Sequence, residues 1–359
     1  MKICFFADGQ SPHTVKWCEH FERLGHDVHL ISFRKCNIQG VSVHFVNVGT
    51  LNVKGGNWKV LFTVLKVRIL LKKIKPDVLH AHYATSYGIV AALTNYHPLV
   101  ISGWGSDILV SPKSSKIMRC LIQWALKKSD AITIVAEHMR ESLVSLGVPP
   151  SKINIITHGI KTNVFCKKEV QKHDVFTFVC SRNFEPLYNH IQLLEAFEIL
   201  MNKGLNVNLK LIGEGSLKED LIHWVDHRNL GKNIYFQGRI SQEEMALELN
   251  KAHVFVTVST TDGDVVSLVE AIACGNYCIG SDIPANKNWI EHNVNGLIVP
   301  LFDKETLANA MIASLENYSR LTEEAMDLNR KIIETTGNWN SNMALAEKLY
   351  FNLMQDGIN

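Results

Sequence analysis

The stretch that decides the fold is STTDGDVVSLVEAIACGNYCIG, residues 259–280. The residues that lead into it (252–259) are apolar and rich in β-branched side chains, which is typical of a buried strand. Asp262-Gly263-Asp264 is turn chemistry, and residues 267–273 have a helical pattern. A helix that begins directly after the carboxyl end of a strand presents free backbone N–H groups, which attract phosphate. In that setting the carboxylates of Asp262 and Glu270 can accept hydrogen bonds from a sugar and a ribose.

The same strand–loop–helix unit repeats along the chain. Apolar strands are expected at 3–7, 27–33, 41–48, 77–83, 99–103, 131–136 and 153–157, and again at 176–180, 207–212, 233–236, 254–259, 277–280 and 297–299. Helical patterns are expected at 13–24, 58–73, 116–128, 137–146, 191–202, 216–227, 242–250, 266–274, 304–316 and 340–354. The polar segment 161–174 suits a linker. The sequence therefore predicts an α/β protein with two successive doubly wound units, each a mainly parallel sheet covered on both faces.

The composition is that of a globular protein. The chain has 359 residues, of which 46% are hydrophobic and 20% charged, enough for two cores. A net charge of +2 is too small to indicate nucleic-acid binding. No secretory signal and no apolar run long enough to span a membrane is visible. The eight cysteines include one close pair, Cys274 and Cys278, whose spacing fits neither a redox nor a zinc motif, so we expect no metal site and a cytoplasmic location.

The acidic pair of the opening stretch resembles a known family signature. Asp262 and the run from Glu270 to Gly275 (EAIACG) resemble the carboxylate–seven residues–carboxylate motif of the retaining family 4 glycosyltransferases, which have the GT-B fold. Those enzymes usually carry glutamate at the first position, and the shorter aspartate here shortens the reach toward the sugar. The alternative is an ordinary crossover with solvated acids. The resemblance implies two Rossmann-like domains that face a central cleft, residues 1–165 on the acceptor side and 175–335 on the nucleotide-sugar side, with a helix in 336–359 that crosses back to the first domain.

A second match follows the strand at 176–180, in the run SRNFEPLYNH (181–190). The family usually places an arginine and, about five residues later, a lysine here, and both grip the donor diphosphate. Arg182 matches and supplies a planar charged fork for phosphate. Leu187 replaces the lysine, as in the family subset with a Glu-Pro-x-Tyr-Asn loop, and Tyr188 and Asn189 can hydrogen-bond phosphate with less charge. The alternative is a surface ion pair between Arg182 and Glu185.

Other donor-side matches are weaker. The Gly213-Glu214-Gly215 turn fits a close approach of the backbone to the donor, or is simply a turn. Arg239 lies in a GRIS loop that resembles the family's nucleotide-contacting loop, and we expect Ser241 with Glu244 to form a helix capping box rather than a ligand contact. The resemblance also assigns the loop and first helical turn to the diphosphate, which adds these donor-binding residues: Gly263, Asp264, Val265, Val266 and Ser267.

The first half of the chain supplies acceptor-side candidates. In VISGWGSD (100–107), Trp104 stands where the family usually has a histidine close to the reacting sugar, and Asp107 is a polar candidate for catalysis. The alternatives are a core role for Trp104 and a helix N-cap for Asp107. The resemblance makes Gly9, His13 and His82, which lie at strand ends, candidates for the acceptor side. The alternative for each histidine is a structural role, which is the commoner one. His158 resembles a position in the family's hinge segment.

Basic residues cluster between 54 and 75 at Lys54, Lys59, Lys66, Arg68, Lys72, Lys73 and Lys75. An amphipathic basic helix can rest on an anionic bilayer as a peripheral membrane contact, or be a solvated helix face. Since many members of the family glycosylate lipid-linked acceptors at the inner face of the membrane, the resemblance favours the bilayer.

The resemblance implies a retaining glycosyltransferase that moves a sugar from a nucleotide diphosphate sugar to a hydroxyl of a glycan or lipid-linked acceptor. It implies no metal ion and no other cofactor, with Arg182, Asp262 and Asp107 as catalytic residues. Two alternatives stay open, a nucleotide-sugar epimerase that uses Asp107 and Glu185 and a non-catalytic relative that binds sugar or a partner. The sequence does not identify the nucleotide, the sugar, the acceptor or the oligomeric state.

Overall fold

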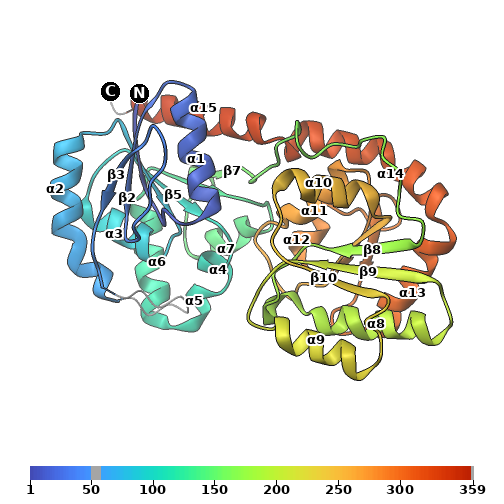
Figure 1. Cartoon of the computed structure of the whole chain (residues 1–359). Helices are drawn as coiled ribbons and strands as arrows, with labels where there is room; N and C mark the ends of the chain where they lie inside the picture. Colours follow the sequence, from blue (N-terminus) through green and yellow to red (C-terminus); the bar gives the residue numbers. More distant parts are fainter. Residues whose placement is uncertain (50–57, 357–359) are drawn as a thin grey trace. The chain divides into compact units, whose positions relative to one another are not determined.

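The computed structural model describes residues 1–49 and 58–356. The chain divides into two compact units, coloured along the sequence in Figure 1: unit 1 is Met1–His158 with Met343–Asn359, and unit 2 is Gly159–Asn342. The expected linker at 161–174 has neither helix nor strand, yet it belongs to unit 2. Asn250 holds it there, since its Oδ1 accepts from the Lys168 N–H (2.7 Å) and its Nδ2 donates to the Cys166 carbonyl (3.0 Å).

Unit 1 contains a seven-stranded parallel sheet in the order β3-β2-β1-β4-β5-β6-β7. Its strands are β1 Lys2–Phe6, β2 Asp27–Ser32, β3 Ser42–Phe45, β4 Val78–His82, β5 Leu99–Gly103, β6 Ala131–Ile134 and β7 Ile153–Ile155. Its helices are α1 Pro12–Arg23, the 3₁₀ helix η1 Trp58–Thr63, α2 Val64–Ile74, α3 Ser86–Thr94, α4 Ser106–Leu109, α5 Ser111–Ser114, α6 Lys116–Lys128, α7 Met139–Ser145 and η2 Pro150–Lys152. The central strands β4, β5 and β6 are buried along their whole length because helices cover both faces.

Unit 2 contains a six-stranded parallel sheet in the order β10-β9-β8-β11-β12-β13. Its strands are β8 Phe176–Cys180, β9 Val207–Ile212, β10 Ile234–Gln237, β11 Val254–Thr257, β12 Tyr277–Ser281 and β13 Gly296–Val299. Its helices are η3 Pro186–Tyr188, α8 His190–Asn202, α9 Lys218–His227, α10 Gln242–Lys251, α11 Val266–Ala273, α12 Pro284–Lys287, α13 Lys304–Glu316, α14 Tyr318–Ile332 and the π-helix η4 Ile333–Gly337. Figure 1 shows α8 and α9 on one face of this sheet and α10 and α11 on the other.

The last helix, α15 (Trp339–Asp356), begins in unit 2 and continues into unit 1 from Met343. Its Tyr350 is fully buried in unit 1, where the hydroxyl lies 2.5 Å from Nδ1 of His80. Glu347 accepts a hydrogen bond from Nε2 of His26 at 2.7 Å. These contacts attach the part of α15 from Met343 onward to unit 1.

Strand order creates one special position in each sheet. In unit 2 the chain leaves β8 toward β9 and β10, then returns to the other side of β8 with β11. In unit 1 it makes the same reversal between β1 and β4. At such a reversal the loops that follow the two neighbouring strands turn in opposite directions and leave a crevice at the carboxyl edge, which is where open α/β sheets bind ligands.

Candidate functional site

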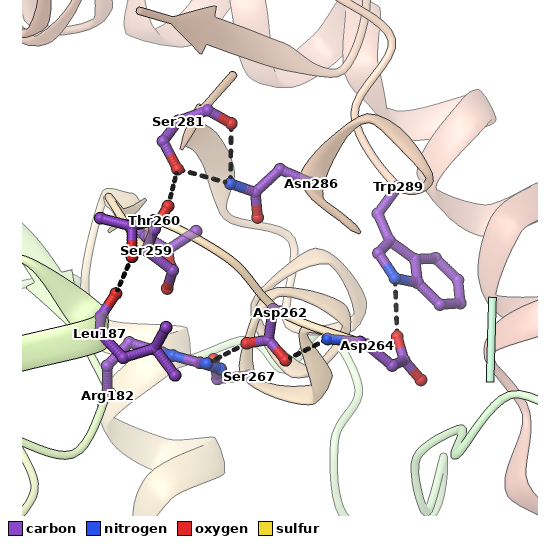
Figure 2. Close-up of polar contacts among 12 residues, drawn as sticks. Arg182, Leu187, Ser259, Thr260, Asp262, Asp264, Ser267, Ser281, Asn286 and Trp289 are labelled. Atoms are coloured by element: carbon purple, nitrogen blue, oxygen red, sulfur yellow. Dashed lines mark hydrogen bonds and ion pairs between the residues drawn. The ribbon is translucent and has the colours of Figure 1, made fainter. Parts of the chain in front are cut away.

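The crevice of unit 2 brings together two residues that separate motifs predicted. Arg182 follows β8 and Asp262 follows β11, and Nη2 of the arginine forms a short ion pair with Oδ2 of the aspartate (Figure 2). Nη1 of Arg182 donates to Oγ of Ser267 at 3.1 Å, in the first turn of α11. The guanidinium carbon also lies 4.2 Å from the centre of the Tyr188 ring, a cation–π contact. The guanidinium is thus fixed in place from three sides.

Burial strengthens this arrangement. The side chains of Arg182 and Asp262 are only 10% and 17% exposed, so water screens the pair weakly.

The alternative pairing of Arg182 with Glu185 is wrong, because the Glu185 carboxylate accepts instead from the N–H (2.9 Å) and the hydroxyl (2.6 Å) of Ser216. These two hydrogen bonds lower the pKa of Glu185.

The loops around the crevice are tied to each other through the backbone. The carbonyl of Leu187 accepts from both N–H (2.9 Å) and Oγ1 (3.2 Å) of Thr260, which joins the loop after β8 to the loop after β11. Asp264 accepts from the indole N–H of Trp289 at 2.9 Å, so this carboxylate anchors the loop. Figure 2 shows these contacts on either side of the Arg182–Asp262 pair. The tie through Trp289 is a feature that sequence reasoning missed.

Helix α11 opens toward the crevice. Its N-cap residue is Val265, which has no side-chain acceptor for the amides of the first turn. The backbone of Gly263, Val266 and Ser267 lies at this amino end, as expected. Glu270 lies in the second helical turn and is half-buried.

Two predicted donor contacts have local partners. Asn189 has a left-handed backbone (φ 49°), and its Nδ2 donates to Oε1 of Gln192 at 2.7 Å, which fixes the start of α8. The Tyr188 ring packs on the guanidinium of Arg182. The structure therefore gives both residues a positioning role in the loop after β8.

The glycine turn after β9 lies against the loop that carries Arg182. A Cβ on Gly213 would come within 2.6 Å of the Arg182 carbonyl oxygen, and a Cβ on Gly215 would overlap the Phe184 backbone. Because both neighbours are backbone atoms, the turn and the loop can pack this closely only with glycine at these positions. This close packing, rather than the approach of a ligand, is what the structure requires of the two glycines.

The loop after β10 carries Gly238 and Arg239. Arg239 is exposed at the same carboxyl edge of the sheet. Ser241 caps α10 in a full capping box with Glu244, with the Ser241 N–H donating to the carboxylate at 2.8 Å and Ser241 Oγ accepting from the Glu244 N–H at 3.2 Å. The predicted capping role of Ser241 is confirmed.

The crevice of unit 1 gathers the acceptor-side candidates into one aromatic cluster. Ring centres of His82 and Trp104 lie 4.6 Å apart, and those of His13 and Trp104 lie 5.7 Å apart. His158, which the sequence placed in a hinge, stacks on His13 at 4.2 Å and also contacts Trp104. Tyr83 adds a ring 5.7 Å from Trp104. Four histidine and aromatic side chains from distant segments thus surround one indole.

The histidines of this cluster are neutral. Burial and the nearby Lys16 charge lower the pKa of His13 to about 4. Burial also holds the pKa values of His82 and His158 well below the usual range. His82 is 1% exposed, and its Nε2 has no hydrogen-bond partner within residues 1–49 and 58–356. A buried donor or acceptor without a partner is costly, so Nε2 of His82 is an uncompensated polar atom inside the cluster.

Two candidates of unit 1 have structural tasks instead. Asp107 is fully buried, and its carboxylate accepts from the backbone N–H groups of Ala84 (2.8 Å), Trp104 (3.0 Å) and Gly105 (3.0 Å). A side chain without exposed surface does not reach a substrate, which argues against the predicted catalytic role. The N-cap of α4 is Gly105, so Asp107 is not the cap either.

Gly9 is the second. Its N–H donates to Oγ of Ser32 at 3.0 Å, and a Cβ at this position would overlap Sγ of Cys36. The glycine is required by the packing of the loop after β1 against the segment that follows β2. The structure therefore supplies a reason for this glycine that needs no ligand.

The described residues form neither a metal-binding cluster nor a membrane-spanning helix. Across residues 1–49 and 58–356, no three His, Cys, Asp or Glu side chains gather closely enough to hold a metal ion. In the same residues no helix has the length and apolar character needed to cross a bilayer.

Comparisons with known proteins match both units. Residues 2–136 match the sequence family described as Glycosyl transferase 4-like, and residues 163–335 match the family described as Glycosyl transferases group 1. The chain belongs to the group 1 glycosyltransferases. The N-acetyl-alpha-D-glucosaminyl L-malate synthase of Bacillus anthracis is 22% identical over 353 residues, which cover 93% of this chain and 91% of that protein.

Solved structures give the fold of this group 1 glycosyltransferase. The sucrose-phosphate synthase of Thermosynechococcus elongatus superposes with a TM-score of 0.84 over 99% of this chain and 100% of that one, at 16% identity. The Anabaena protein HepE in complex with UDP gives a TM-score of 0.80 over 97% and 99% of the two chains, also at 16% identity. These likenesses confirm the GT-B fold that the sequence predicted.

Proposed function

We propose that the chain is a retaining glycosyltransferase that moves a sugar from a nucleotide diphosphate sugar to a hydroxyl of a glycan or lipid-linked acceptor, in polysaccharide or glycolipid assembly. The observation that carries this proposal is the Arg182–Asp262 pair at the strand-order reversal of unit 2. A fixed cation beside the uncapped amino end of α11 is suited to a diphosphate. The enzyme class itself rests on the family.

Each group of the unit 2 crevice would bind a different part of the donor. The diphosphate would bind Arg182 and the amides at the start of α11, and Asp262 would then be free to accept a hydrogen bond from a donor sugar hydroxyl. Glu270 would accept from the ribose. Because the guanidinium is already held by Tyr188 and Ser267, little conformational freedom is lost when the donor binds.

The chemical step would need no side-chain base. The bond between the sugar carbon and the diphosphate oxygen breaks while the bond from that carbon to the acceptor oxygen forms on the same face. The proton of the acceptor hydroxyl goes to the departing diphosphate oxygen. Arg182 and the dipole of α11 would stabilise the charge that develops on that oxygen, so no metal ion would be required.

Relatives indicate which donors to try first. An Escherichia coli relative, 25% identical over 68% of this chain, is named as a UDP-Gal:alpha-D-GlcNAc-diphosphoundecaprenol alpha-1,3-galactosyltransferase. The HepE structures hold UDP or UDP-glucose. We therefore propose a UDP-sugar donor and a hydroxyl acceptor on a glycan or a lipid-linked glycan.

The test is thermal unfolding of the protein with UDP-, GDP-, ADP-, CMP- and dTDP-sugars in the presence of EDTA. A ligand at 100 times its Kd stabilises the folded state by about 2.7 kcal/mol, which raises the midpoint measurably. We expect one nucleotide to raise the midpoint of the wild type and of Arg228→Ala, but not of Arg182→Ala or Glu270→Ala. Arg228 is a matched control because it too combines a ring contact (Trp224, 3.9 Å) with an ion pair (Glu198, 3.3 Å).

The outcomes separate the alternatives. No shift with any nucleotide sugar would favour a non-catalytic relative. A shift together with sugar conversion in the absence of acceptor would favour an epimerase. Transfer that requires a divalent ion would overturn the metal-independent step, and a product of inverted anomeric configuration by proton NMR would overturn the retaining one.

A further inference from the structure

The surface of unit 1 carries an exposed apolar stripe on η1 and α2. The inner side of this segment packs into the core through Val60, Val67, Leu71 and Ile74. Four large apolar side chains project from the opposite side: Trp58 (48% exposed), Phe62 (87%), Leu65 (70%) and Ile69 (68%). Their spacing of four, three and four residues keeps them on one side of a helix. Leu70, next to Ile69, is half-buried and is not part of the stripe.

The charge around this stripe is of one sign. The sequence has no Asp or Glu from residue 28 to residue 76, and the same stretch contains nine Lys and Arg residues. Lys59, Lys66, Lys72 and Lys73 are exposed, and none of the four takes part in an ion pair with another described residue. Lys54, the first lysine of the predicted basic cluster, lies outside the described residues.

The lysines lie beside the stripe rather than opposite it. With about 100° between successive residues of a helix, Lys66 and Lys73 fall on one flank of the stripe and Lys72 on the other. Arg68 is not part of this surface, because its guanidinium donates to the carbonyls of Leu93 and Thr94 at 3.1 Å each. We call Trp58, Phe62, Leu65, Ile69 and the flanking Lys59, Lys66, Lys72 and Lys73 the α2 face.

We propose that the α2 face rests on a bilayer that contains anionic lipid, with the apolar stripe among the acyl chains and the lysines at the headgroups. A protein partner would need acidic groups on both sides of an apolar groove, whereas a lipid surface supplies anionic headgroups around an apolar interior by its nature. A helix that combines an apolar stripe with lysine flanks is the arrangement that binds such a surface. The inference goes beyond glycosyl transfer and rests on the surface of unit 1 alone.

Both parts of the α2 face contribute to the expected affinity. Removing one fully inserted phenylalanine side chain should weaken partitioning about tenfold or more, given the hydrophobic free energy of such a side chain. A lysine near an anionic surface contributes about fivefold, and its replacement by glutamate should cost more than that. The electrostatic part is screened by salt and the apolar part is not.

The experiment is sedimentation of the full chain with vesicles, without any donor or acceptor. Vesicles of phosphatidylcholine with about 30% phosphatidylglycerol, which carry a negative surface potential, are compared with vesicles of phosphatidylcholine alone. We expect binding to the anionic vesicles that weakens about tenfold in Phe62→Ser and several-fold in Lys66→Glu. Phe302→Ser, at a 72% exposed phenylalanine in unit 2, and Lys128→Glu, at an exposed lysine of α6, are matched controls that should bind as the wild type does.

Three results would overturn the proposal. The first is equal binding by Phe62→Ser and the wild type, and the second is no binding of the wild type to anionic vesicles at low salt. The third is a wild type that is dimeric by sedimentation velocity while Phe62→Ser is monomeric, since the α2 face would then be an interface with a second copy. Both substituted side chains are exposed, so unchanged melting temperatures will show that the variants fold. Because no nucleotide sugar is present, failure here leaves the proposed transferase activity untouched.

Discussion

Asp107 offers the sharpest test of how the loops of unit 1 are built. Replacing it with alanine leaves three buried backbone N–H groups, those of Ala84, Trp104 and Gly105, without their acceptor. An orphaned buried donor costs about 1–3 kcal/mol, so Asp107→Ala should lower the free energy of unfolding of unit 1 by at least about 3 kcal/mol.

Asparagine at the same position should be much milder. Burial raises the pKa of Asp107 even though backbone hydrogen bonds oppose that rise, so the charge itself is unfavourable in this site. Asp107→Asn removes the charge, keeps the oxygen that accepts from Trp104 and Gly105, and loses the bond from Ala84. We expect a loss of about 1–3 kcal/mol, because only the Ala84 N–H is left without an acceptor.

The assay is urea unfolding followed by tryptophan fluorescence, with Asp226→Ala at an exposed aspartate as the control. For a slope of about 2 kcal/mol per molar urea, the alanine variant should unfold at a midpoint roughly 1.5 M lower. The result that refutes this reasoning is an Asp107→Ala protein with the wild-type midpoint. If that protein also lacked transferase activity, Asp107 would be a catalytic residue after all.

Three more predictions concern other elements. Gly215→Ala should destabilise unit 2 by about 1–3 kcal/mol in the same assay, because its Cβ would overlap the Phe184 backbone. The control is Gly231→Ala, which should have no such effect because the nearest atom to its Cβ is 3.8 Å away. Equal effects of the two substitutions would contradict the packing argument. Ser241→Ala should cost about 1 kcal/mol through loss of the capping box and leave nucleotide binding unchanged, and lost binding would instead show a ligand role. Burial lowers the pKa of His80 in the folded protein to about 3. In the unfolded chain the pKa is about 6.5, so below that pH the unfolded chain binds a proton that the folded protein does not. This histidine should therefore reduce the free energy of unfolding by about 2 kcal/mol between pH 7 and pH 5. His80→Gln should remove that part of the pH dependence, and an unchanged slope would rule it out.

Strand positions followed from the sequence because both sheets are parallel and buried. Each expected strand in both halves appears in the structure within a few residues, since continuous apolar runs such as 99–103 suit strands covered on both faces. Helix α3 was not predicted because it is buried nearly all round and therefore shows no polar face at the helical period. Helix α14 was also missed.

The site could be predicted in parts but not in its contacts. Arg182 and Asp262 were each found from a local motif, yet they are 80 residues apart, and only the strand order that places β8 beside β11 makes them a pair. His158 was missed as part of the unit 1 cluster for the same reason, because its stacking on His13 depends on two distant strand ends. Asp107 looked available in the sequence because burial is not visible in a local pattern.

The late arrival of α15 has a consequence for how the chain is made. Residues 1–158 leave the ribosome first, but Tyr350, which fills the space beside His80, follows only after all of unit 2 has been synthesised. At roughly 5–20 residues per second, the roughly 180 residues between them take on the order of 10–40 s. During that interval the surface of unit 1 that α15 will cover is still exposed, because Phe21 and His80 lack their contacts with Tyr350. The N-terminal half is thus the first to be translated and the last to be completed.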